Sequence, residues 1–441
     1  MAEPIHDLLG VGIGPFNLGL ACLAEPLDDL DTIFVDENPA FDWHPGLLIE
    51  GATLQTPFLA DLVTLADPTS PYSFLNYLKQ TGRLYAFYIR ESFSMLRAEY
   101  NRYCRWVCER LPSLVFDARV TDIEYDGRFG CYRVRVEHPV GGGRSLYRAR
   151  RLVLGSGPAR SVPECCRGLD GPVFHAADYL SHRDALAEVE SITLVGSGQS
   201  AAEIFHDRLN LAGPDQRLDW FTRSPRFFAM AYDKLTLELT SPEYIDYFHG
   251  LDEHSRRRLR DSHKSLYKGI SEDLSNAIFD RLYEKDVHGT ANVGLQANAE
   301  LSAATRDPVS GCYELSFEQT EQRLRFRHRS QALILATGFA QRVPDYLRSI
   351  VDRICWDDRG RFAVSRDYRI DHGAAAVFVQ NAELHTHGFS ASDLGMACYR
   401  NAVILQAVTG VAHYPIERRI AFQHFDAHAH VAQPANGRSR A

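Results

Sequence analysis

The sequence has neither a long apolar run nor a surplus of basic residues. No stretch of its 441 residues reaches the ~18 consecutive apolar positions that a membrane span needs. Its 48 Lys and Arg are outnumbered by 57 Asp and Glu, for a formal net charge of −9. We therefore expect no nucleic-acid partner and no membrane partner. With 45% hydrophobic residues, the composition predicts a soluble globular protein of about two or three domains.

Cysteine pairs and a secretory signal are also missing. The nine cysteines include no CxxC pair. The spacing of Cys104 and Cys108 and the adjacency of Cys165 and Cys166 suit neither a structural zinc site nor a dithiol redox centre. Residues 1–7 (MAEPIHD) have neither a basic nor an apolar region of the kind that begins a signal peptide. The sequence thus predicts no disulfide framework, no metal centre and a cytoplasmic location.

The first motif lies in residues 7–23 (DLLGVGIGPFNLGLACL). A short apolar strand, 8–11, leads into GxG and then into a helix with apolar periodicity. In a dinucleotide fingerprint one glycine makes the turn, the next lets the backbone approach a pyrophosphate, and the helix N-terminus faces the anion. A second strand, 32–35, ends in two acids, at the distance where a carboxylate binds an adenosine ribose. The expected nucleotide contacts are Gly12, Gly14, Pro15, Asn17 (in place of the third glycine), Asp36 and Glu37.

A second fingerprint follows in residues 191–203 (SITLVGSGQSAAE), again as strand, GxGxxA and helix. Its next strand, 218–222, ends in an arginine instead of an acid. A guanidinium pairs with a 2′-phosphate, which a carboxylate would repel, so the pattern favours NADPH over NADH. The expected contacts are Gly196, Gly198, Gln199, Ser200, Arg223 and Arg226.

Two fingerprints in one chain predict an α/β protein with two Rossmann-like domains, typically one for a flavin and one for a nicotinamide. A third glycine-ended strand, 331–338 (QALILATG), includes Thr337 and Gly338 and lies where such flavoproteins return to the first domain. We therefore predict a discontinuous FAD-binding domain, an inserted NADPH-binding domain with a helical, substrate-contacting segment, and a mobile tail. Their ranges are 1–185 with 330–425, 186–329 with the helical segment 242–286, and 426–441.

Further segments carry a family resemblance: FDWHPG (41–46), LQTPFLADLVTLADPTSPYSFLNYL (54–78) and THGFSASDLGMACYRN (386–401). With the two fingerprints, they resemble the flavin-dependent N-hydroxylating monooxygenases of hydroxamate siderophore biosynthesis. These enzymes hydroxylate the side-chain amine of lysine or ornithine, or one amine of putrescine or cadaverine. The resemblance implies FAD and NADPH as cofactors, O2 as co-substrate and a C4a-(hydro)peroxyflavin that a neutral amine attacks. It also implies a homotetramer, a role in iron acquisition, and a downstream acyltransferase that consumes the hydroxylamine.

At matching positions the resemblance puts Trp43 and His44 near the flavin and adenosine, and Gln55 beside the isoalloxazine ring. It implies no catalytic side-chain acid or base. A primary amine with a pKa near ~10.4 must lose its proton before it reacts, which a desolvated pocket favours. His385 and His387 have a spacing that metal ligands use, but without further ligands we interpret them as structural.

Departures from the family pattern carry the substrate information. The amino-acid hydroxylases place a lysine at the position of Ala60, where it pairs with the substrate carboxylate, and polar residues at the positions of Leu266 and Gly395. Without a cation, burying a substrate carboxylate would cost several kcal/mol. We therefore predict an aliphatic diamine, putrescine or cadaverine, as substrate. The candidates to bind its second ammonium are Tyr267, Glu383 and Asp393.

Two alternatives stay open. One is L-lysine N6-hydroxylation, or L-ornithine N5-hydroxylation, with Lys264 or Lys268 binding the carboxylate instead of the missing lysine. The other is a non-catalytic flavoprotein that binds nucleotides as a sensor. A disulfide reductase is not expected, because no CxxC follows the first fingerprint.

Overall fold

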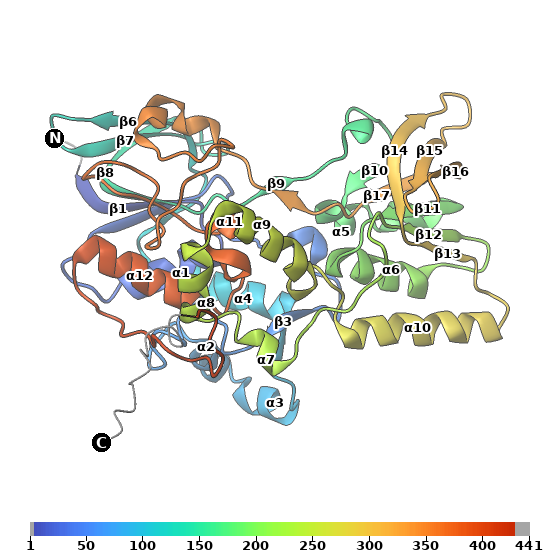
Figure 1. Ribbon diagram of the computed structural model, residues 1–441, viewed down its shortest axis with the longest axis horizontal. Helices are drawn as coiled ribbons and strands as arrows, with labels where there is room; N and C mark the ends of the chain where they lie inside the picture. Colours follow the sequence, from blue (N-terminus) through green and yellow to red (C-terminus); the bar gives the residue numbers. More distant parts are fainter. Residues whose placement is uncertain (1–3, 428–441) are drawn as a thin grey trace, which may run out of the picture.

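Two sheets organise the chain, and they lie at opposite ends of the molecule (Figure 1). The computed structural model describes residues 4–427. The first sheet has the order β5-β2-β1-β8-β7-β6, and β19 also pairs with β8. Its strands are β1 (Ile5–Val11), β2 (Thr32–Val35), β5 (Leu114–Val115), β6 (Arg119–Asp126), β7 (Cys131–Glu137), β8 (Arg144–Leu154) and β19 (Val377–Val379).

Strand β1 explains the apolar run that precedes the first fingerprint. It pairs in parallel with both β2 and β8, so it lies inside the sheet. Its consecutive residues Leu8 and Leu9 are both fully buried but belong to different core clusters, one on each face of the sheet. A strand covered on both faces needs a continuous apolar sequence and not an alternating one.

The second sheet is parallel throughout, with the order β10-β17-β11-β12-β13. An antiparallel three-stranded sheet packs beside it, and the rings of Phe221 and Phe317 stack between them with centroids 4.4 Å apart. The strands are β10 (Val173–His175), β11 (Ser191–Val195), β12 (Arg217–Phe221), β13 (Val293–Gln296), β14 (Ala299–Arg306), β15 (Tyr313–Gln319), β16 (Leu324–Ser330) and β17 (Ala332–Leu335). The predicted α/β class is confirmed.

The two connections between the sheets run side by side. They pair as the short antiparallel strands β9 (Ala159–Arg160) and β18 (Phe339–Ala340). The predicted domain boundaries at residues 185 and 330 lie beyond these crossings, inside the part that holds the second sheet, because β10 and β17 hydrogen-bond there. We therefore propose boundaries at β9 and β18 in place of 185 and 330.

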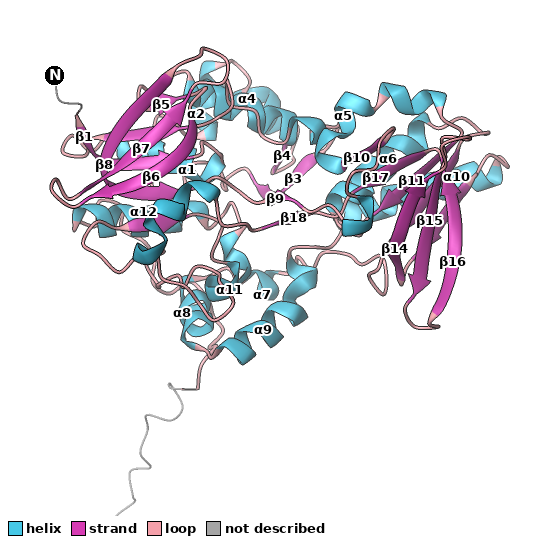
Figure 2. Cartoon of the chain, turned by 90° about the horizontal axis from the view of Figure 1, so that it is seen from above, coloured by secondary structure: helices cyan, strands magenta, loops and turns pink. Residues whose placement is uncertain are grey.

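The helices cover both sheets and fill the space between them (Figure 2). In the first part, α1 packs against α12. In the second part, α10 packs along α6. These elements are α1 (Pro15–Ala24), α2 (Phe74–Gln80), α3 (Leu84–Ile89), α4 (Arg97–Cys108), α5 (Tyr179–His182), α6 (Gln199–Leu211), α10 (Glu272–Val287), α11 (Leu384–His387) and α12 (Ala397–Thr409), with the small sheet β3 (Thr53–Pro57) and β4 (Ser94–Leu96).

The predicted helical segment 242–286 divides between the two parts. Helices α8 (Pro242–Gly250) and α9 (Glu253–Ser262) follow α7 (Lys234–Leu237), and the three lie together between the sheets (Figure 2). α8 is tied to the first part, since Arg366 Nε donates to Asp246 Oδ1 over 2.6 Å and His249 Nε2 donates to the Val364 carbonyl over 3.1 Å. α10 instead lies on the second part. The two halves of this segment thus belong to different parts of the fold.

The last described residues lie across α7 and α8 and hydrogen-bond to them. The backbone N–H groups of Ile420 and Ala421 donate to Glu243, and those of Phe422 and Gln423 donate to Glu238. The predicted mobile tail, 426–441, lies outside the described residues apart from its first two positions. Within residues 4–427, no helix has the length and apolar character that crossing a membrane requires.

Candidate active site

The first glycine turn joins β1 to α1. Gly12 has φ +88°, and a Cβ there would lie 2.6 Å from the carbonyl oxygen of Gly155. Gly14 precedes α1 as its N-cap without any side-chain cap, Pro15 follows it, and the first turn holds no acid. A Cβ on Gly14 would meet no atom within 4 Å. The uncapped N–H groups of α1 are therefore accessible to a diphosphate, as a bound dinucleotide requires.

The side chain of Asn17 is engaged within the protein. It is fully buried, and Nδ2 donates to the carbonyl groups of Val11 and Gly12 over 3.2 and 2.7 Å. Its Oδ1 accepts from Gln380 Nε2 over 2.7 Å. The side-chain amide is thus unavailable to the pyrophosphate, and the prediction that Asn17 contacts it rests on the backbone N–H in the first turn of α1. The amide braces the turn from inside, and Gly155 supplies the room, since a Cβ there would lie 2.5 Å from Asn17 Nδ2.

The two acids after β2 have different surroundings. Asp36 Oδ2 accepts from the Ile13 N–H over 2.7 Å, and its Oδ1 accepts from the Asn38 backbone and side chain, both over 2.8 Å. Asp36 is thereby held against the first glycine turn. Glu37 is exposed and pairs with Arg119 over 3.0 Å. Of the two, Asp36 is the one positioned for a ribose.

The second glycine turn repeats the geometry of the first. Gly196 has φ +152°, and a Cβ there would lie 2.2 Å from the carbonyl oxygen of Ala336, after β17. Gly198 is the N-cap of α6 without a side-chain cap, and Ser200 lies in the first turn of this helix, which holds no acid. α6 thus presents free N–H groups to an anion, like α1.

Gln199 is committed to contacts within the protein. Its Nε2 donates to Glu203 Oε1 over 3.0 Å and reaches Ser271 Oγ at 3.4 Å. Its Oε1 accepts from the Ser271 N–H over 2.8 Å. The prediction that Gln199 contacts the nucleotide through its amide is not supported, because these bonds occupy the group.

Two exposed arginines follow β12. The Arg223 side chain is 79% exposed, and its Nη1 lies 3.8 Å from Glu300 Oε1, at the outer limit for an ion pair. Arg226 is also exposed. A guanidinium so weakly engaged stays available for a phosphate.

The backbone of Lys268 lies beside the second turn. Its carbonyl oxygen lies 3.6 Å from the position of a Cβ on Gly198. Burial lowers the pKa of Lys268, and the nearby cations lower it further, while Asp261 opposes them. We call these four residues the cationic cluster: Arg223, Arg260, Lys264 and Lys268. The two lysines that were candidates for a substrate carboxylate thus share a positive field with Arg223, beside the second nucleotide turn.

Aromatic rings line the region between the two turns. The His44 ring lies 5.0 Å from Trp43 and 5.5 Å from Phe339, between ring centroids, and Phe339 also meets His175 at 5.2 Å. Burial of the ring, and then the charges of Arg97 and His175, lower the pKa of His44 to about 4. The residue keeps an exposed surface, so a neutral His44 is suited to stack against a planar ring system.

The remaining predicted cofactor contacts have mixed surroundings. Gln55 is half-buried in β3 and makes one weak bond, from Nε2 to the Thr53 carbonyl over 3.3 Å. Its amide can therefore serve a ligand. Thr337 instead donates to the Ser161 carbonyl, and the Gly338 carbonyl accepts from His175 Nε2 over 2.9 Å. The Thr337 hydroxyl and the Gly338 carbonyl therefore hold the crossing strands together.

Three predicted substrate residues converge, although Ala60 is more than 300 positions from Asp393 and Gly395. The Gly395 N–H donates to Asp393 Oδ1 over 2.8 Å. A Cβ on Gly395 would lie 3.3 Å from that oxygen and 3.9 Å from the Cβ of Ala60. Burial raises the pKa of Asp393, and within residues 4–427 no side chain forms an ion pair with it. The charge of Arg400 partly offsets that rise, so the site holds a half-buried carboxylate that has a cation nearby but no ion-pair partner among the described residues.

Tyr232 is a further candidate for this group and had no sequence signal. Partial burial, and then the charge of Asp393, raise the pKa of its phenol to about 12, and the residue keeps 42% of its surface exposed. It comes from the loop before α7, which matches no motif. We call Ala60, Tyr232, Asp393 and Gly395 the Asp393 cluster.

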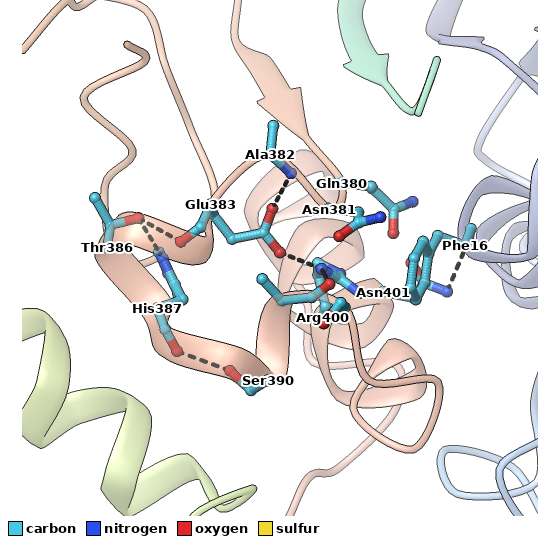
Figure 3. A network of polar contacts seen from close by, with 12 residues as sticks. Phe16, Gln380, Asn381, Ala382, Glu383, Thr386, His387, Ser390, Arg400 and Asn401 are labelled. Atoms are coloured by element: carbon cyan, nitrogen blue, oxygen red, sulfur yellow. Dashed lines mark hydrogen bonds and ion pairs between the residues drawn. The ribbon is translucent and has the colours of Figure 1, made fainter. Parts of the chain in front are cut away.

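Glu383 is buried in an ion pair instead of facing a substrate. Its side chain and that of Arg400 are 0% and 2% exposed, and Arg400 Nη1 donates to Glu383 Oε1 (Figure 3). The other oxygen accepts from the Ala382 N–H over 2.7 Å. The prediction that Glu383 binds the second ammonium is therefore wrong, because Arg400 already neutralises its charge.

Tyr267 and Leu266 belong to a small apolar cluster. The Tyr267 ring lies parallel to that of Phe389, with centroids 6.5 Å apart, and Leu266 packs in the same cluster. Burial raises the pKa of Tyr267. Neither side chain contacts the Asp393 cluster by any interaction in the described residues, so they are weaker candidates for the substrate ammonium than Asp393.

The two histidines of the HTH sequence serve the fold. His385 Nε2 donates to the Phe362 carbonyl over 2.8 Å, and His387 Nε2 donates to the Arg366 carbonyl over 3.2 Å. His387 Nδ1 lies 2.9 Å from Thr386 Oγ1 (Figure 3). Burial lowers the pKa of both rings. Since each Nε2 is protonated toward a carbonyl, the contacts agree with the structural interpretation.

Comparisons with known proteins identify the family of the chain. Residues 4–341 match the family model of L-lysine 6-monooxygenase/L-ornithine 5-monooxygenase. The chain is 49% identical over 422 residues to a putrescine N-hydroxylase of Shewanella oneidensis, covering 96% of this chain and 84% of that protein. It is 48% identical over 438 residues to an alcaligin biosynthesis enzyme of Bordetella pertussis, covering 99% and 94%.

A solved structure extends the likeness to the fold. The FAD-bound cadaverine monooxygenase DfoA of the desferrioxamine pathway, from Erwinia amylovora, superposes with a TM-score of 0.93 at 50% identity, covering 96% of this chain and 99% of that one. The resemblance deduced from the sequence motifs is confirmed. The chain belongs to the L-lysine 6-monooxygenase/L-ornithine 5-monooxygenase family.

Proposed function

We propose that this protein is an FAD- and NADPH-dependent monooxygenase that N-hydroxylates one primary amine of an aliphatic diamine, putrescine or cadaverine, for hydroxamate siderophore biosynthesis. The observation that carries the substrate choice is the Asp393 cluster, a desolvated carboxylate beside Ala60 and Gly395. The names of the relatives point the same way: one is a putrescine N-hydroxylase and another a cadaverine monooxygenase.

The two glycine turns supply the cofactor sites. Gly12, Gly14 and the N-terminus of α1 would hold the FAD diphosphate, with Asp36 near a ribose. Gly196, Gly198 and the N-terminus of α6 would hold NADPH, with Arg223 and the cationic cluster near its phosphates. FAD reduced by NADPH supplies the activation of O2 for transfer to the amine. Gln55 and His44 would border the flavin.

The charges of the Asp393 cluster discriminate between diamines and amino acids. Asp393 would pair with the ammonium at the far end of a diamine, while the reacting end, away from this carboxylate, loses its proton in a desolvated site. An α-carboxylate at the same place would meet a like charge, and Ala60 offers no cation to offset it.

The amino-acid alternative needs another cation at the substrate. Lys268, which could provide one, lies beside Gly198 and in the field of Arg223. That surrounding favours the second nucleotide as its ligand. L-lysine and L-ornithine therefore remain the second candidates, and a non-catalytic flavoprotein is disfavoured by the family membership.

A comparison of four amines tests the proposed function. We expect NADPH oxidation and hydroxylamine formation with putrescine or cadaverine at a kcat/KM about 100-fold above that with L-lysine or L-ornithine, equivalent to roughly 3 kcal/mol. Both quantities are measured for each amine, so that oxidation without product is recognised. More product from lysine or ornithine than from either diamine would overturn the diamine assignment.

Arg223 should set the preference for NADPH over NADH. Removing one charge-assisted contact to the 2′-phosphate in Arg223→Ala costs roughly 1.5–3 kcal/mol, so we expect the KM for NADPH to rise by about 10- to 100-fold. The KM for NADH is the internal control and should stay within ~2-fold of wild type. Equal changes in both KM values would exclude recognition of the 2′-phosphate by Arg223.

We also propose that the protein is a homo-oligomer, a homotetramer by its family resemblance, and that an acyltransferase consumes its product in the cytoplasm. Exposed apolar side chains on and after α3 support an interface: Tyr85, Tyr88, Ile89 and Phe93 are between 71% and 78% exposed. Such a concentration of exposed aromatic surface is typical of protein contacts.

A further inference from the structure

A buried ion pair joins the two nucleotide-binding parts. Arg97, the first residue of α4, places Nη1 2.8 Å from Oε2 of Glu203 in α6. The two side chains are 13% and 5% exposed. Arg97 begins α4, whose Tyr100 and Tyr103 are buried in the core of the first part, and its N–H donates to the Ala52 carbonyl over 2.9 Å. Glu203 belongs to the helix that begins at the second glycine turn.

The second oxygen of Glu203 acts on the start of that same helix. Glu203 Oε1 accepts from Gln199 Nε2 over 3.0 Å, and Gln199 is the residue that directly follows Gly198. Gln199 in turn binds Ser271, the N-cap of α10. One carboxylate therefore links the first part, the N-terminus of α6 and the start of α10.

Packing alone does not explain a carboxylate at this position. Burial raises the pKa of Glu203, while Arg97 and Gln199 oppose the rise. Buried ion pairs contribute little net stability compared with apolar residues of the same volume. A negative charge one turn into a helix whose N-terminus is to receive phosphates also weakens that anion site. What the pair does provide is a fixed direction between two otherwise separate elements.

Arg97 extends this link toward the first cofactor site. It contributes to the lowered pKa of His44, so the guanidinium lies near that ring. Polar contacts thus run from Arg97 through Glu203 to Gln199 beside the second glycine turn, and the charge of Arg97 also acts on His44.

We infer that Glu203 is a positioning residue for electron transfer between the two nucleotides. By holding Arg97 with one oxygen and Gln199 with the other, it sets the position of the α6 N-terminus relative to the first part, and so the distance between nicotinamide and flavin. In the reaction concerned, NADPH gives up a hydride, two electrons and a proton, to FAD and becomes NADP⁺. This inference rests on the cofactor assignment of the proposed function and not on the identity of the amine.

The test separates the rate of flavin reduction from nucleotide affinity. In Glu203→Ala we expect anaerobic reduction of the flavin by saturating NADPH to slow by about 10- to 100-fold, since misplacement by ~1 Å costs that order. The Kd for NADP⁺, titrated separately, should stay within ~3-fold. Glu203→Gln keeps the volume and the bond to Gln199 and should slow reduction by a smaller factor, roughly 3- to 10-fold. It serves as the test if the alanine variant does not fold.

Two controls make the outcome specific. In the double variant Arg97→Ala with Glu203→Ala, flavin reduction should be no slower than in the slower of the two single variants, because each substitution removes the same ion pair. Glu99→Ala breaks a comparable pair, Arg83–Glu99 at 2.9 Å, which starts on the same helix but stays within the first part; its reduction rate should match wild type. Wild-type reduction rates in Glu203→Ala and Glu203→Gln, or a loss of rate fully explained by NADP⁺ affinity, would overturn the inference. No amine is present, so failure of the diamine assignment would leave this measurement intact.

Discussion

Asp393→Asn should lower kcat/KM for putrescine and cadaverine by about 100-fold, because it removes a charge-assisted bond in a desolvated site worth roughly 2–3 kcal/mol. The asparagine oxygen can still accept from the Gly395 N–H, so the loop should keep its shape. A monoamine of the same length has no second ammonium, and its turnover should be unchanged in the variant. Steady-state hydroxylamine formation with both kinds of amine measures the difference.

The pH profile offers a second measure of the same group. Burial raises the pKa of Asp393, and the carboxylate must be ionised to hold the ammonium. kcat/KM for the diamines should therefore fall as the pH drops through this raised pKa, above the ~3.9 of a free aspartate. Asp393→Asn should lose that limb. An unchanged profile would mean that Asp393 does not bind the substrate.

Ala60→Lys complements this experiment from the other side of the cluster. A new ammonium close to Asp393 would occupy the carboxylate and repel the diamine, so diamine turnover should decrease. Turnover equal to wild type would show that Ala60 lies away from the substrate. Asp393→Asn removes a negative charge and Ala60→Lys adds a positive one. A loss of diamine turnover from both is expected only if the diamine is bound between the two residues.

The parts of the site that the sequence could predict are the local ones. Gly12 and Gly196 each follow an apolar strand and precede a helix, and the strand, turn and helix lie within about twenty residues. The backbone geometry of so short a segment depends on its own residues. The side-chain contacts of Asn17 and Gln199 could not be predicted, because a side-chain amide bonds to whatever polar group is nearest. For Asn17 that group is Gln380, 363 positions away.

Charges and short strands were harder to place for the same reason. Glu383 is buried and Asp393 half-buried in one segment, but Arg400 forms an ion pair with the first and not with the second. The sequence contains no information on that choice. Strand β17 was predicted, but β10 has only three residues, too few to be recognised, and its pairing with β17 is the reason we propose other domain boundaries. Tyr232 comes from a loop without a motif and was found only through its proximity to Asp393.

Arg400→Ala should cause the largest loss of stability of any single change considered. It leaves Glu383 charged, fully buried and without its partner, at a cost of about 3–5 kcal/mol. Arg400 also donates to the Ala391 carbonyl over 2.8 Å and lies 4.4 Å from the centroid of the Phe16 ring, in the first turn of α1. The midpoint of urea-induced unfolding should fall accordingly, and FAD retention should weaken because α1 loses that packing.

A second substitution, at Glu383, identifies the cause of this loss of stability. If the loss comes from an unpaired buried charge, Arg400→Met with Glu383→Met should be more stable than Arg400→Met alone, because the double change removes both charges and keeps much of the volume. Arg348→Ala is the control, since it breaks the exposed pair with Asp345, in which the side chains are 80% and 85% exposed, and should cost less than about 1 kcal/mol. A double variant as unstable as the sum of the two single ones would show that Arg400 and Glu383 stabilise the fold through separate contacts, and that charge pairing is not what holds α12 against the segment that begins at Glu383.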